Sequence, residues 1–218
     1  MPELPPPLPA EILARRDHLP VKPAPVELAG DLVTLRPLEL DADVAPLHAV
    51  SCGAPFTLGT RSVGAYDPEA VIWRFMAGGP FATAAQLRDY LARQDATPDA
   101  RPFTVRDRAS SVPVGIINLM ANQPQHLKIE LGAIWYGPIA QRTGASREAT
   151  HLLLAHAFAL GYQRVEWKCN ALNEASRRAA LSYGFRFEGI QDAHYIIKDR
   201  RRDTAWYRML AHEFAATM

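Results

Sequence analysis

Two patterns of hydrophobic positions divide the chain from residue 31 onward. Hydrophobic and polar residues alternate with a period of two in short stretches that are typical of half-buried β-strands. These stretches are residues 32–38, 103–106, 112–120, 127–136, 164–169, 185–189, 194–198 and 204–210. Helical spacing is found in residues 41–50, 68–76, 83–94, 146–160 and 174–183. The order, β-α-α-α followed by β-β-β-α-β-α-β-β, predicts an α/β fold with a mixed, mostly antiparallel central sheet and helices on both faces.

Glycine, proline and polar residues mark the breaks between these elements. The breaker Gly78-Gly79-Pro80 separates two helices, residues 107–111 form the polar turn of a hairpin, and residues 199–202 form a turn before the last strand. Residues 121–126 form a second loop. Asn173 is a typical N-cap for the last helix, which Gly184 ends.

The strand at residues 127–136 changes character halfway along. It begins with hydrophobic residues at 127, 129 and 131 and with charged residues at 128 and 130. After Gly132 this alternation is lost. Loss of register beside a glycine predicts a β-bulge or a strand that separates from its neighbour.

A turn that contains a glycine connects this strand to a strongly apolar helix. The segment 137–158 reads GPIAQRTGASREATHLLLAHAF, and its turn residues are Gln141, Arg142, Thr143, Gly144, Ala145 and Ser146. The first backbone N–H groups of a helix have no partners within it, so this turn predicts an anion-binding site.

The first 29 residues differ from the rest because they are rich in proline. Proline disfavours both helices and sheet ladders, so most of this segment should be extended. We therefore divide the chain into an N-terminal extension, residues 1–29, and a single domain, residues 30–218. The extension is interpreted as a loosely held leader, although it could reach a second copy of the chain in a homodimer.

Composition narrows the class of protein. Of 218 residues, 48% are hydrophobic, enough for a sizeable core, and the net charge of +1 gives no basic field for nucleic acid. Cys52 and Cys169 form neither a metal-type pair nor a disulfide framework. The start does not follow the pattern of a signal peptide, and no apolar run approaches the ~20 residues of a membrane helix. We therefore expect a cytoplasmic protein that binds neither nucleic acid nor a membrane.

Several short motifs, in this order, resemble those of the GNAT superfamily of N-acetyltransferases. They are Val114-Gly115, Glu130-Leu131-Gly132, the turn from Gln141 to Ser146 with Arg147-Glu148-Ala149 after it, Asn173-Glu174-Ala175-Ser176-Arg177-Arg178 with Gly184-Phe185, Phe187-Glu188-Gly189, and Arg202-Asp203. The last pieces are similar to the branch of ribosomal-protein N-terminal acetyltransferases (RimJ/RimL-like). The resemblance spans residues 32 to 210 and implies the GNAT fold.

The resemblance also implies acetyl-CoA as co-substrate, with no metal. The residues that would contact acetyl-CoA are Ile134, Trp135, Tyr136, Gln141, Arg142, Thr143, Gly144, Ala145, Ser146, Asn173 and Arg178. A backbone N–H at 134–136 would also stabilise the oxyanion. Trp135 and Tyr136 can be core aromatics at the same time, because backbone and side chain act separately.

For catalysis the resemblance points to Glu130 or His194 as the base that takes a proton from the amine, and to Ser176 as the acid near the CoA sulfur. An α-amine has a pKa of ~8, so a modest base suffices. Each residue also has a purely structural interpretation: Glu130 as a solvated strand residue paired with Lys128 or a neighbour, His194 as a half-exposed histidine, and Ser176 as a helix-surface serine.

Three departures from the family pattern stand out. Ser146 replaces the usual Gly or Ala at the end of the turn, where it could cap the helix. One extra residue lies between Glu130 and the turn. Ala180 occupies the position at which many GNAT enzymes have a tyrosine acid, and Tyr183 lies on a different helical face.

The sequence therefore predicts an N-acetyltransferase that moves the acetyl group to a primary amine by direct attack in a ternary complex. The amine would belong to a protein N-terminus or to a small molecule. The alternative is a catalytically silent module that binds acyl-CoA, which the missing tyrosine and the altered turn suggest.

Overall fold

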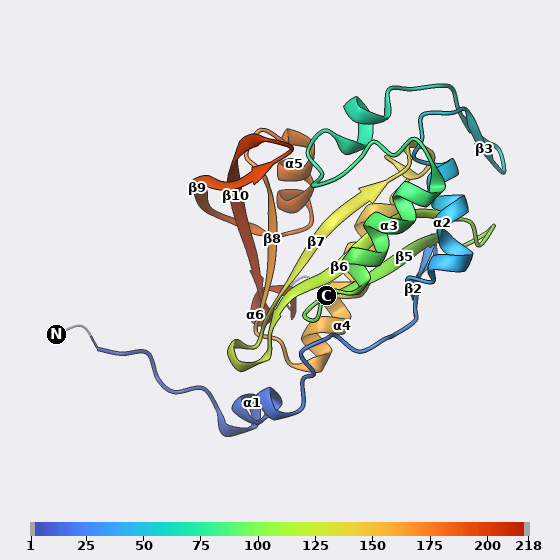
Figure 1. Cartoon of the computed structure of the whole chain (residues 1–218). Helices are drawn as coiled ribbons and strands as arrows, with labels where there is room; N and C mark the ends of the chain where they lie inside the picture. The colour runs from blue at the N-terminus through green and yellow to red at the C-terminus, as the bar shows by residue number, and fades with distance from the viewer. Residues whose placement is uncertain (1–2, 216–218) are drawn as a thin grey trace.

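A sheet of eight strands forms the centre of the computed structural model, which describes residues 3–215 (Figure 1). In spatial order the strands are β1 (Leu28–Ala29), β2 (Val33–Pro37), β5 (Arg101–Asp107), β6 (Pro113–Gln123), β7 (Lys128–Tyr136), β8 (Arg164–Asn170), β10 (Arg200–Leu210) and β9 (Arg186–Ile197). All neighbours pair antiparallel except β7 and β8. A small separate hairpin is made of β3 (Phe56–Leu58) and β4 (Arg61–Val63).

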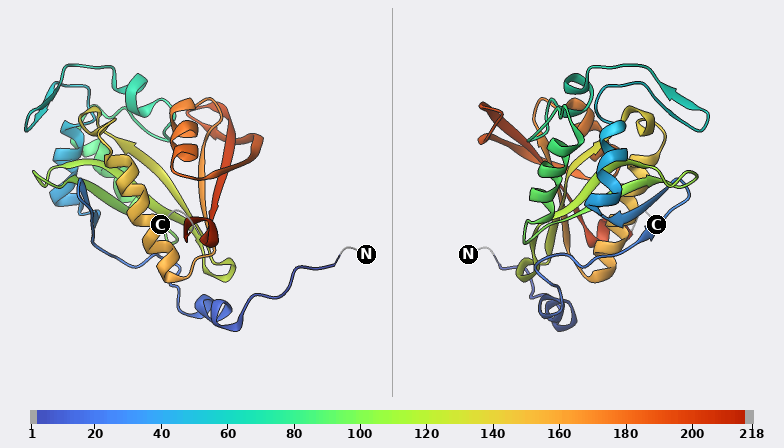
Figure 2. Two further views of the ribbon diagram at one scale, coloured as in Figure 1. Left: turned by 180° about the vertical axis from the view of Figure 1, so that it is seen from behind. Right: turned by 45° about the vertical axis from the view of Figure 1, so that its right-hand side comes forward.

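Helices cover both faces of this sheet (Figure 2). The α-helices are α1 (Ala10–Leu13), α2 (Leu40–Ala49), α3 (Ala84–Asp95), α4 (Ala145–Leu160), α5 (Glu174–Ser182) and α6 (Ala211–Ala215). Short turns of other helix types are η1 (Ala14–Asp17), η2 (Glu69–Trp73), η3 (Pro124–His126) and η4 (Pro138–Ala140). The predicted α/β fold with a mixed, mostly antiparallel sheet is confirmed.

Two hydrophobic cores fix the helices to the sheet. The larger core lies between the sheet and α4 and α5, and it contains Leu153 and Ala180, both fully buried. The smaller core lies under α2 and α3 on the opposite face and is centred on Trp73, whose ring packs 5.0 Å from that of Trp135. Because α3 lies over the middle of the sheet, this second face of β8 to β10 is left without a helix (Figures 1 and 2).

The helix ends follow the signals in the sequence. Thr83 accepts a hydrogen bond from the Gln86 backbone N–H, and the Gln86 side chain bonds back, as in a capping box. The Asn173 side chain accepts from the Ser176 backbone N–H at 3.1 Å, so Asn173 is the predicted N-cap of α5. Gly161 ends α4 in the left-handed conformation, with φ of 104°.

The last hairpin differs from the prediction. Residues 185–189 and 194–198 are not two pieces but parts of one strand, β9, which is interrupted by a bulge at Ala193. The Asp203 carboxylate accepts a hydrogen bond from the Ala193 N–H at 2.8 Å and stabilises this bulge. The predicted turn at 199–202 is also wrong, because the chain reverses at Lys198 and Asp199 and β10 already begins at Arg200.

Two further segments depart from their predictions. Of residues 68–76, only Glu69–Trp73 is helical, as one wide turn of π-helix, after which the chain enters a loop. In the predicted loop at 121–126, β6 continues to Gln123, and only Pro124–His126 turns.

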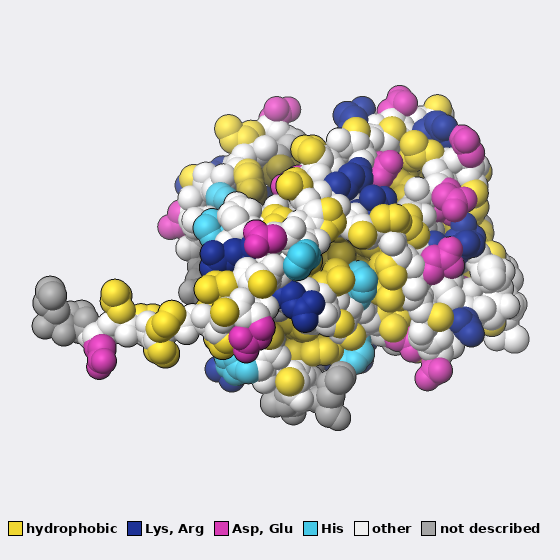
Figure 3. All heavy atoms as spheres, turned by 90° about the horizontal axis from the view of Figure 1, so that it is seen from below, with side chains coloured by type: hydrophobic (Ala, Val, Ile, Leu, Met, Phe, Trp, Pro, Cys, Tyr) yellow, Lys and Arg dark blue, Asp and Glu magenta, His cyan; other side chains and the backbone are white. Residues whose placement is uncertain are grey.

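The N-terminal extension is held to the domain over its second half. The Asn122 side chain donates hydrogen bonds to the carbonyls of Pro20 and Val21, at 2.9 and 2.8 Å, and β1 joins the sheet beside β2. The interpretation as a loosely held leader is therefore wrong for residues 20–29. Residues 3–9 extend away from the body and expose hydrophobic side chains, including Leu4 and Leu8 (Figures 1 and 3).

The division at residue 29 stays a prediction. Residues 1–2 of the proposed extension and 216–218 of the proposed domain lie outside the described part. No helix among residues 3–215 has the length and apolar character needed to cross a bilayer.

The β7–β8 pair is the feature of the sheet that positions the site. These parallel strands are joined only from Lys128 opposite Arg164 to Leu131 opposite Trp167, and they have no further ladder pairs. On its other edge β7 carries the predicted bulge: Gly132 lies opposite Asn118 and Trp135 opposite Ile116, so two residues of β7 face one of β6. Ala133 takes a positive φ of 48° there.

Candidate active site

A cavity of about 350 Å³ lies where β7 and β8 separate. Its walls come from β6, β7, β8, the start of α5, the end of α3, the loop after η2 and the β9–β10 hairpin. Of the residues predicted for the site, Glu130, Ile134, Asn173 and Ser176 line this cavity together. Segments far apart in the sequence thus converge at one opening of the sheet.

Among residues 3–215, Glu130 is the only carboxylate that lines this cavity, and only 7% of the residue is exposed. Burial raises the pKa of its carboxyl group above the usual value, and the nearby Lys168 ammonium opposes this shift. The Lys168 Nζ lies 2.8 Å from a Glu130 oxygen and 3.1 Å from Glu166. Glu130 is therefore a buried, paired carboxylate next to the cavity and not a solvated strand residue.

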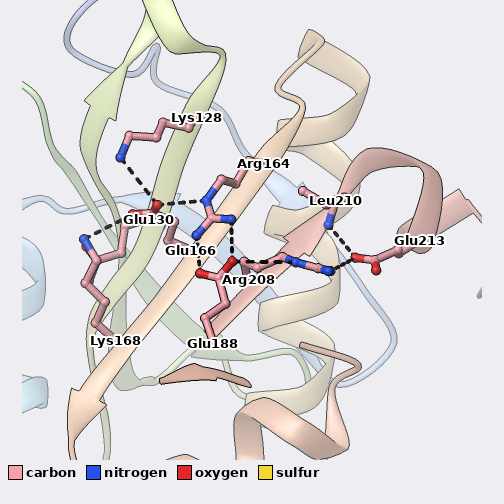
Figure 4. Close-up of polar contacts among 9 residues, drawn as sticks. All are labelled: Lys128, Glu130, Arg164, Glu166, Lys168, Glu188, Arg208, Leu210 and Glu213. Atoms are coloured by element: carbon pink, nitrogen blue, oxygen red, sulfur yellow. Dashed lines mark hydrogen bonds and ion pairs between the residues drawn. The ribbon is translucent and has the colours of Figure 1, made fainter. Parts of the chain in front are cut away.

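Lys168 connects Glu130 to a network of paired charges on the face of β8 to β10 that no helix covers (Figure 4). Glu166 is paired with Lys128 at 3.4 Å and with Arg164 at 2.9 Å. Arg164 also donates to Glu188 at 2.9 Å. The remaining members are Arg208 and Glu213, which form an ion pair with each other. We call these residues, Lys128, Arg164, Glu166, Lys168, Glu188, Arg208 and Glu213, the charge network.

Ser176 lines the cavity and has a hydrogen-bond partner on each side of its hydroxyl. The Trp167 Nε1–H donates a hydrogen bond to the Ser176 Oγ at 3.0 Å. Because that bond uses a lone pair of the oxygen, the Ser176 O–H can donate to another acceptor. The Cys169 thiol is one neighbour within reach, and burial raises the pKa of this thiol. Ser176 thus stands at the cavity wall with Trp167 as its donor and the Cys169 sulfur as an acceptor for its proton.

The bulge of β7 leaves backbone groups at the edge of the cavity. Ala133 and Ile134 line the cavity at the point where β7 has lost its partner β8. The side chains of Trp135 and Tyr136 are buried at 3% and 7% exposure, one in each core. Their side chains therefore pack, while the backbone of this stretch stays available on the β8 side.

The turn after β7 has the form of an anion site. Among residues 3–215 nothing accepts hydrogen bonds from the backbone N–H groups of Gly144, Ser146 and Arg147. Gly144 is the N-cap of α4 with φ of 91°, a conformation that favours glycine. The expectation that Ser146 caps the helix is wrong, because α4 begins one residue earlier and the Ser146 hydroxyl instead bonds the Tyr183 hydroxyl at 3.0 Å.

The other turn residues hold the turn in shape. Gln141 donates from its side chain to the Tyr136 carbonyl at 3.0 Å, and the Thr143 hydroxyl donates to the Ala140 carbonyl at 2.7 Å. Arg142 is exposed with a positive φ of 62°, and Ala145 is buried.

Three sequence positions lie apart from the cavity. Arg178 is on the exposed side of α5, paired with Glu174 at 3.1 Å. Ala180, at the position of the family's tyrosine, is fully buried in the core. His194 does not line the cavity, whereas its neighbour Tyr195 does, because successive residues of a strand point to opposite faces.

The surroundings of His194 are aromatic. Its ring packs 3.8 Å from that of Tyr195 and 5.5 Å from that of Trp206, and burial lowers its pKa. The role of His194 as a base stays a prediction, and the position of His194 outside the cavity does not favour it.

Lys168 and Arg202 both line the cavity. The sequence analysis missed Lys168, and it favoured a solvated hairpin tip for the run Arg200-Arg201-Arg202 over contact with an acidic substrate or a cofactor phosphate. Lys168 stands on the polar side of its strand, as does Glu130, and the parallel register of β7 and β8 brings the two together. Arg202 was assigned to a turn, which hid the strand alternation that directs it to the cavity. The motif Arg202-Asp203 was the signal that could have found it.

A larger groove of about 960 Å³ continues outward from the cavity. The two share Phe75, Asn170, Asn173, Ile197 and Arg202. The groove runs between η2, the start of α5 and the tip of the β9–β10 hairpin. Among the residues that the structure describes, no group of three or more His, Cys, Asp or Glu side chains has the arrangement of a metal site.

Comparison with known proteins identifies the fold and the family. A sequence profile of the acetyltransferase (GNAT) domain matches residues 33–186. A GCN5-related N-acetyltransferase from Brucella melitensis is 35% identical with a TM-score of 0.79, over 89% of this chain and 82% of that one. A GNAT-family protein from Chromobacterium violaceum is 29% identical with a TM-score of 0.82, over 99% of this chain and 100% of that one.

More distant structures share the fold alone. A spermidine N-acetyltransferase variant from Vibrio cholerae is 18% identical, with a TM-score of 0.60 over 85% of this chain and 98% of that one. The search of curated proteins gave no match. The domain match over most of the chain, together with the structural likeness, shows that this protein belongs to the GNAT family of acetyltransferases.

Proposed function

We propose that this protein is an acetyl-CoA-dependent N-acetyltransferase that acetylates a primary amine by direct attack in a ternary complex. The observation that carries the proposal is the cavity at the separation of β7 and β8, which combines a buried carboxylate, a serine hydroxyl and unpaired strand backbone. GNAT enzymes in general use acetyl-CoA and an amine acceptor.

The residues present fit acetyl-CoA. The free N–H groups of Gly144, Ser146 and Arg147 at the start of α4 suit the pyrophosphate, because they point partial positive charge at an anion. The unpaired edge of β7 leads from this turn back to the cavity and offers backbone partners for the pantetheine arm. Ser176 and Asn173 lie on the opposite wall, beside the place for the thioester.

Glu130 acts as the base in this proposal. Its carboxylate takes a proton from the attacking ammonium, directly or through water, and its raised pKa brings it closer to that of the amine. The backbone N–H groups at the bulge stabilise the charge that develops on the thioester oxygen. The Ser176 hydroxyl then turns from the Cys169 thiol and donates to the departing sulfur of CoA.

The acceptor of the proposed reaction is an amine, either at a protein N-terminus or on a small molecule. The resemblance of residues 173–203 to the ribosomal-protein N-terminal acetyltransferases favours a protein N-terminus. The groove outside the cavity has a volume of about 960 Å³, which leaves room for a chain end and supports the same choice.

The alternative of a catalytically silent acyl-CoA-binding module rests on Ala180, which cannot replace a tyrosine acid from its place in the core. The Ser176 hydroxyl at the cavity wall favours the enzyme, because it can donate to the departing sulfur in place of a tyrosine. The two hypotheses differ in turnover and not in acetyl-CoA binding.

The test begins with calorimetric titration of the purified protein with acetyl-CoA. We expect micromolar affinity that is lost in Gly144→Glu, because a Cβ at residue 144 would lie 2.8 Å from the Leu32 side chain and the new carboxylate would repel the pyrophosphate. Gly59→Glu is the matched control, because Gly59 also has a positive φ but has open space around it and lies outside the site.

Release of free CoA thiol in the presence of a broad panel of amines then separates the enzyme from the silent module. Binding without release across the panel would favour the silent module. Lack of acetyl-CoA binding by the unmodified protein would reject both hypotheses.

A further inference from the structure

Arg202 is a cationic side chain without a carboxylate partner inside the cavity. Its guanidinium makes no hydrogen bond or ion pair with any residue in the described range 3–215, and its Nε is buried without an acceptor. The guanidinium does lie 5.6 Å from the centre of the Tyr195 ring. Burial lowers the pKa of Arg202, which reflects the cost of a charge that is only partly compensated.

The carboxylate that lines the same cavity, Glu130, already has a cationic partner. Glu130 is paired with Lys168 at 2.8 Å, although the charge of Arg202 also affects the pKa of Glu130. The charged groups that line the cavity are thus one carboxylate with its own lysine and one additional arginine. An anionic group in the cavity would complete this set.

The outer groove also has more cationic side chains than carboxylates. Its cationic side chains are Arg74, Lys198, Arg200, Arg201 and Arg202, and its carboxylates are Asp67, Glu69 and Glu174. Each of these carboxylates has a partner: Glu69 pairs with Lys198 at 3.0 Å, Glu174 with Arg178 at 3.1 Å, and Asp67 accepts from the backbone N–H of Glu69.

Arg74 and Arg200, by contrast, have no carboxylate partner within residues 3–215. The groove therefore presents unpaired arginines along its length, from its outer wall to Arg202 at the cavity.

We infer that the amine acceptor carries a carboxylate, which Arg202 binds while the amine faces Glu130. This inference rests on the proposed function and specifies its acceptor. Arginine suits the role because its planar guanidinium can bind a carboxylate with two parallel hydrogen bonds. The ligand would be a free acidic amino acid or the N-terminal residue of an acidic peptide, in which amine and carboxylate are a few bonds apart.

The same charges disfavour a polycation. A polyamine such as spermidine would bring positive charge toward Arg202 and toward Arg74 and Arg200 in the groove, where Asp67 is the one carboxylate among the described lining residues that is not paired with a cation. Like charges placed together at an interface are a common means of rejecting the wrong partner. The acceptor of this protein should therefore differ from that of the spermidine N-acetyltransferase that shares its fold.

The test compares acceptors that differ only in charge. Glutamate and glutamine, both used as their α-amides so that only the side chain can supply a carboxylate, form one pair. Peptides beginning with Glu or with Gln form the second, and spermidine is the cationic acceptor. For the acidic member of either pair we expect kcat/KM to be about 10- to 100-fold higher, the range of a hydrogen bond to a charged group. A preference confined to the peptides or to the free amino acids identifies the source of the carboxylate.

Substitutions of Arg202 test whether this residue causes the preference for acidic acceptors. Arg202→Met should abolish the preference, and Arg202→Lys should restore part of it. Arg88→Met is the matched control, because Arg88 is exposed on α3 and pairs with Asp41 away from the cavity. The affinity of each variant for acetyl-CoA, measured by calorimetry, should stay within about threefold of the unmodified protein, since a larger loss would assign Arg202 to the co-substrate and overturn the inference.

The inference fails separately from the proposed function. The inference would be overturned if glutamine were acetylated as efficiently as glutamate, the Gln peptide as efficiently as the Glu peptide, or spermidine as efficiently as the acidic acceptors. Any of these results would leave the acetyltransferase activity in place. If no amine is acetylated, the proposed function fails, and titration of the CoA-bound protein with glutamate and glutamine decides the rest. Binding of glutamate that is tenfold tighter and sensitive to Arg202→Met would support the carboxylate site, and equal binding would reject it.

Discussion

The two ends of the β7–β8 pair differ in whether their charged side chains have partners of opposite charge. At the joined end, every charged side chain of the network has an opposite partner, and Glu166 alone is in contact with three cations (Figure 4). At the separated end, Arg202 lines the cavity and has no carboxylate partner among residues 3–215. Glu130 lies at the boundary, paired with the network through Lys168 and exposed to the cavity at the same time.

This difference distinguishes stability from function. Charges that are mutually satisfied stabilise the sheet or cost little, and they need no ligand. A buried charge without a partner is costly, so it is most simply explained by a ligand that completes it. Substitutions in the network should therefore change the free energy of unfolding, and substitutions at the cavity should change activity.

The largest effect should come from Glu130→Gln. Loss of a general base reduces kcat/KM by about 100- to 10,000-fold. The folded protein should not be less stable at pH 7, because burial raises the pKa of Glu130 and the folded state therefore disfavours its charged form. Steady-state kinetics and thermal unfolding test both halves. Activity within threefold of the unmodified protein would remove Glu130 from the reaction.

Glu166→Gln should have the opposite profile. Removal of this buried charge leaves Lys128, Arg164 and Lys168 close together without their common partner, which should lower the free energy of unfolding by about 3 kcal/mol. We expect kcat/KM to change less than fivefold, because Glu166 does not line the cavity. Urea denaturation measures the loss of stability. A loss of kcat/KM greater than fivefold with an unchanged free energy of unfolding would contradict the distinction between the two ends.

The pH dependence of stability should follow the network. Burial alone would raise the pKa of Glu166, but the hydrogen bond from Arg164 and the charge of Lys168 lower it below the ordinary 4.5. A lowered folded-state pKa contributes stability that is present above pH 4.5 and is lost as the pH falls through the folded pKa.

We therefore expect part of the stability present at pH 6 to be lost from this group by pH 3. Urea denaturation at a series of pH values should show a smaller acid loss in Glu166→Gln than in the unmodified protein. An equal acid loss in both would mean that other carboxylates govern the acid transition.

Ser176→Ala should give the smallest change. The hydroxyl donates only as the CoA sulfur departs, and water can replace it in part, so kcat should fall about tenfold while the Kd for acetyl-CoA stays the same. A thiol-release assay and calorimetry measure the two quantities. An increase of Kd with kcat unchanged would make Ser176 a binding residue and not an acid.

Local signals in the sequence were enough to predict much of the fold. Strand alternation, the N-cap at Asn173 and the loss of register after Gly132 are each set by neighbours along the chain, so residue order reveals them. The last hairpin was misread because its bulge at Ala193 is held by Asp203 from the next strand. No local pattern contains that contact.

The sequence by itself determined the fold, the turn at the start of α4 and the placement of Glu130 on the polar side of β7. Only the tertiary structure decided which charges are satisfied. The parallel register of β7 and β8 brings Lys168 to Glu130, and the reversal at Lys198 and Asp199 turns Arg202 into the cavity. The partners of a buried charge come from distant strands, so spacing along the chain cannot reveal whether a charge is paired or is left for a ligand.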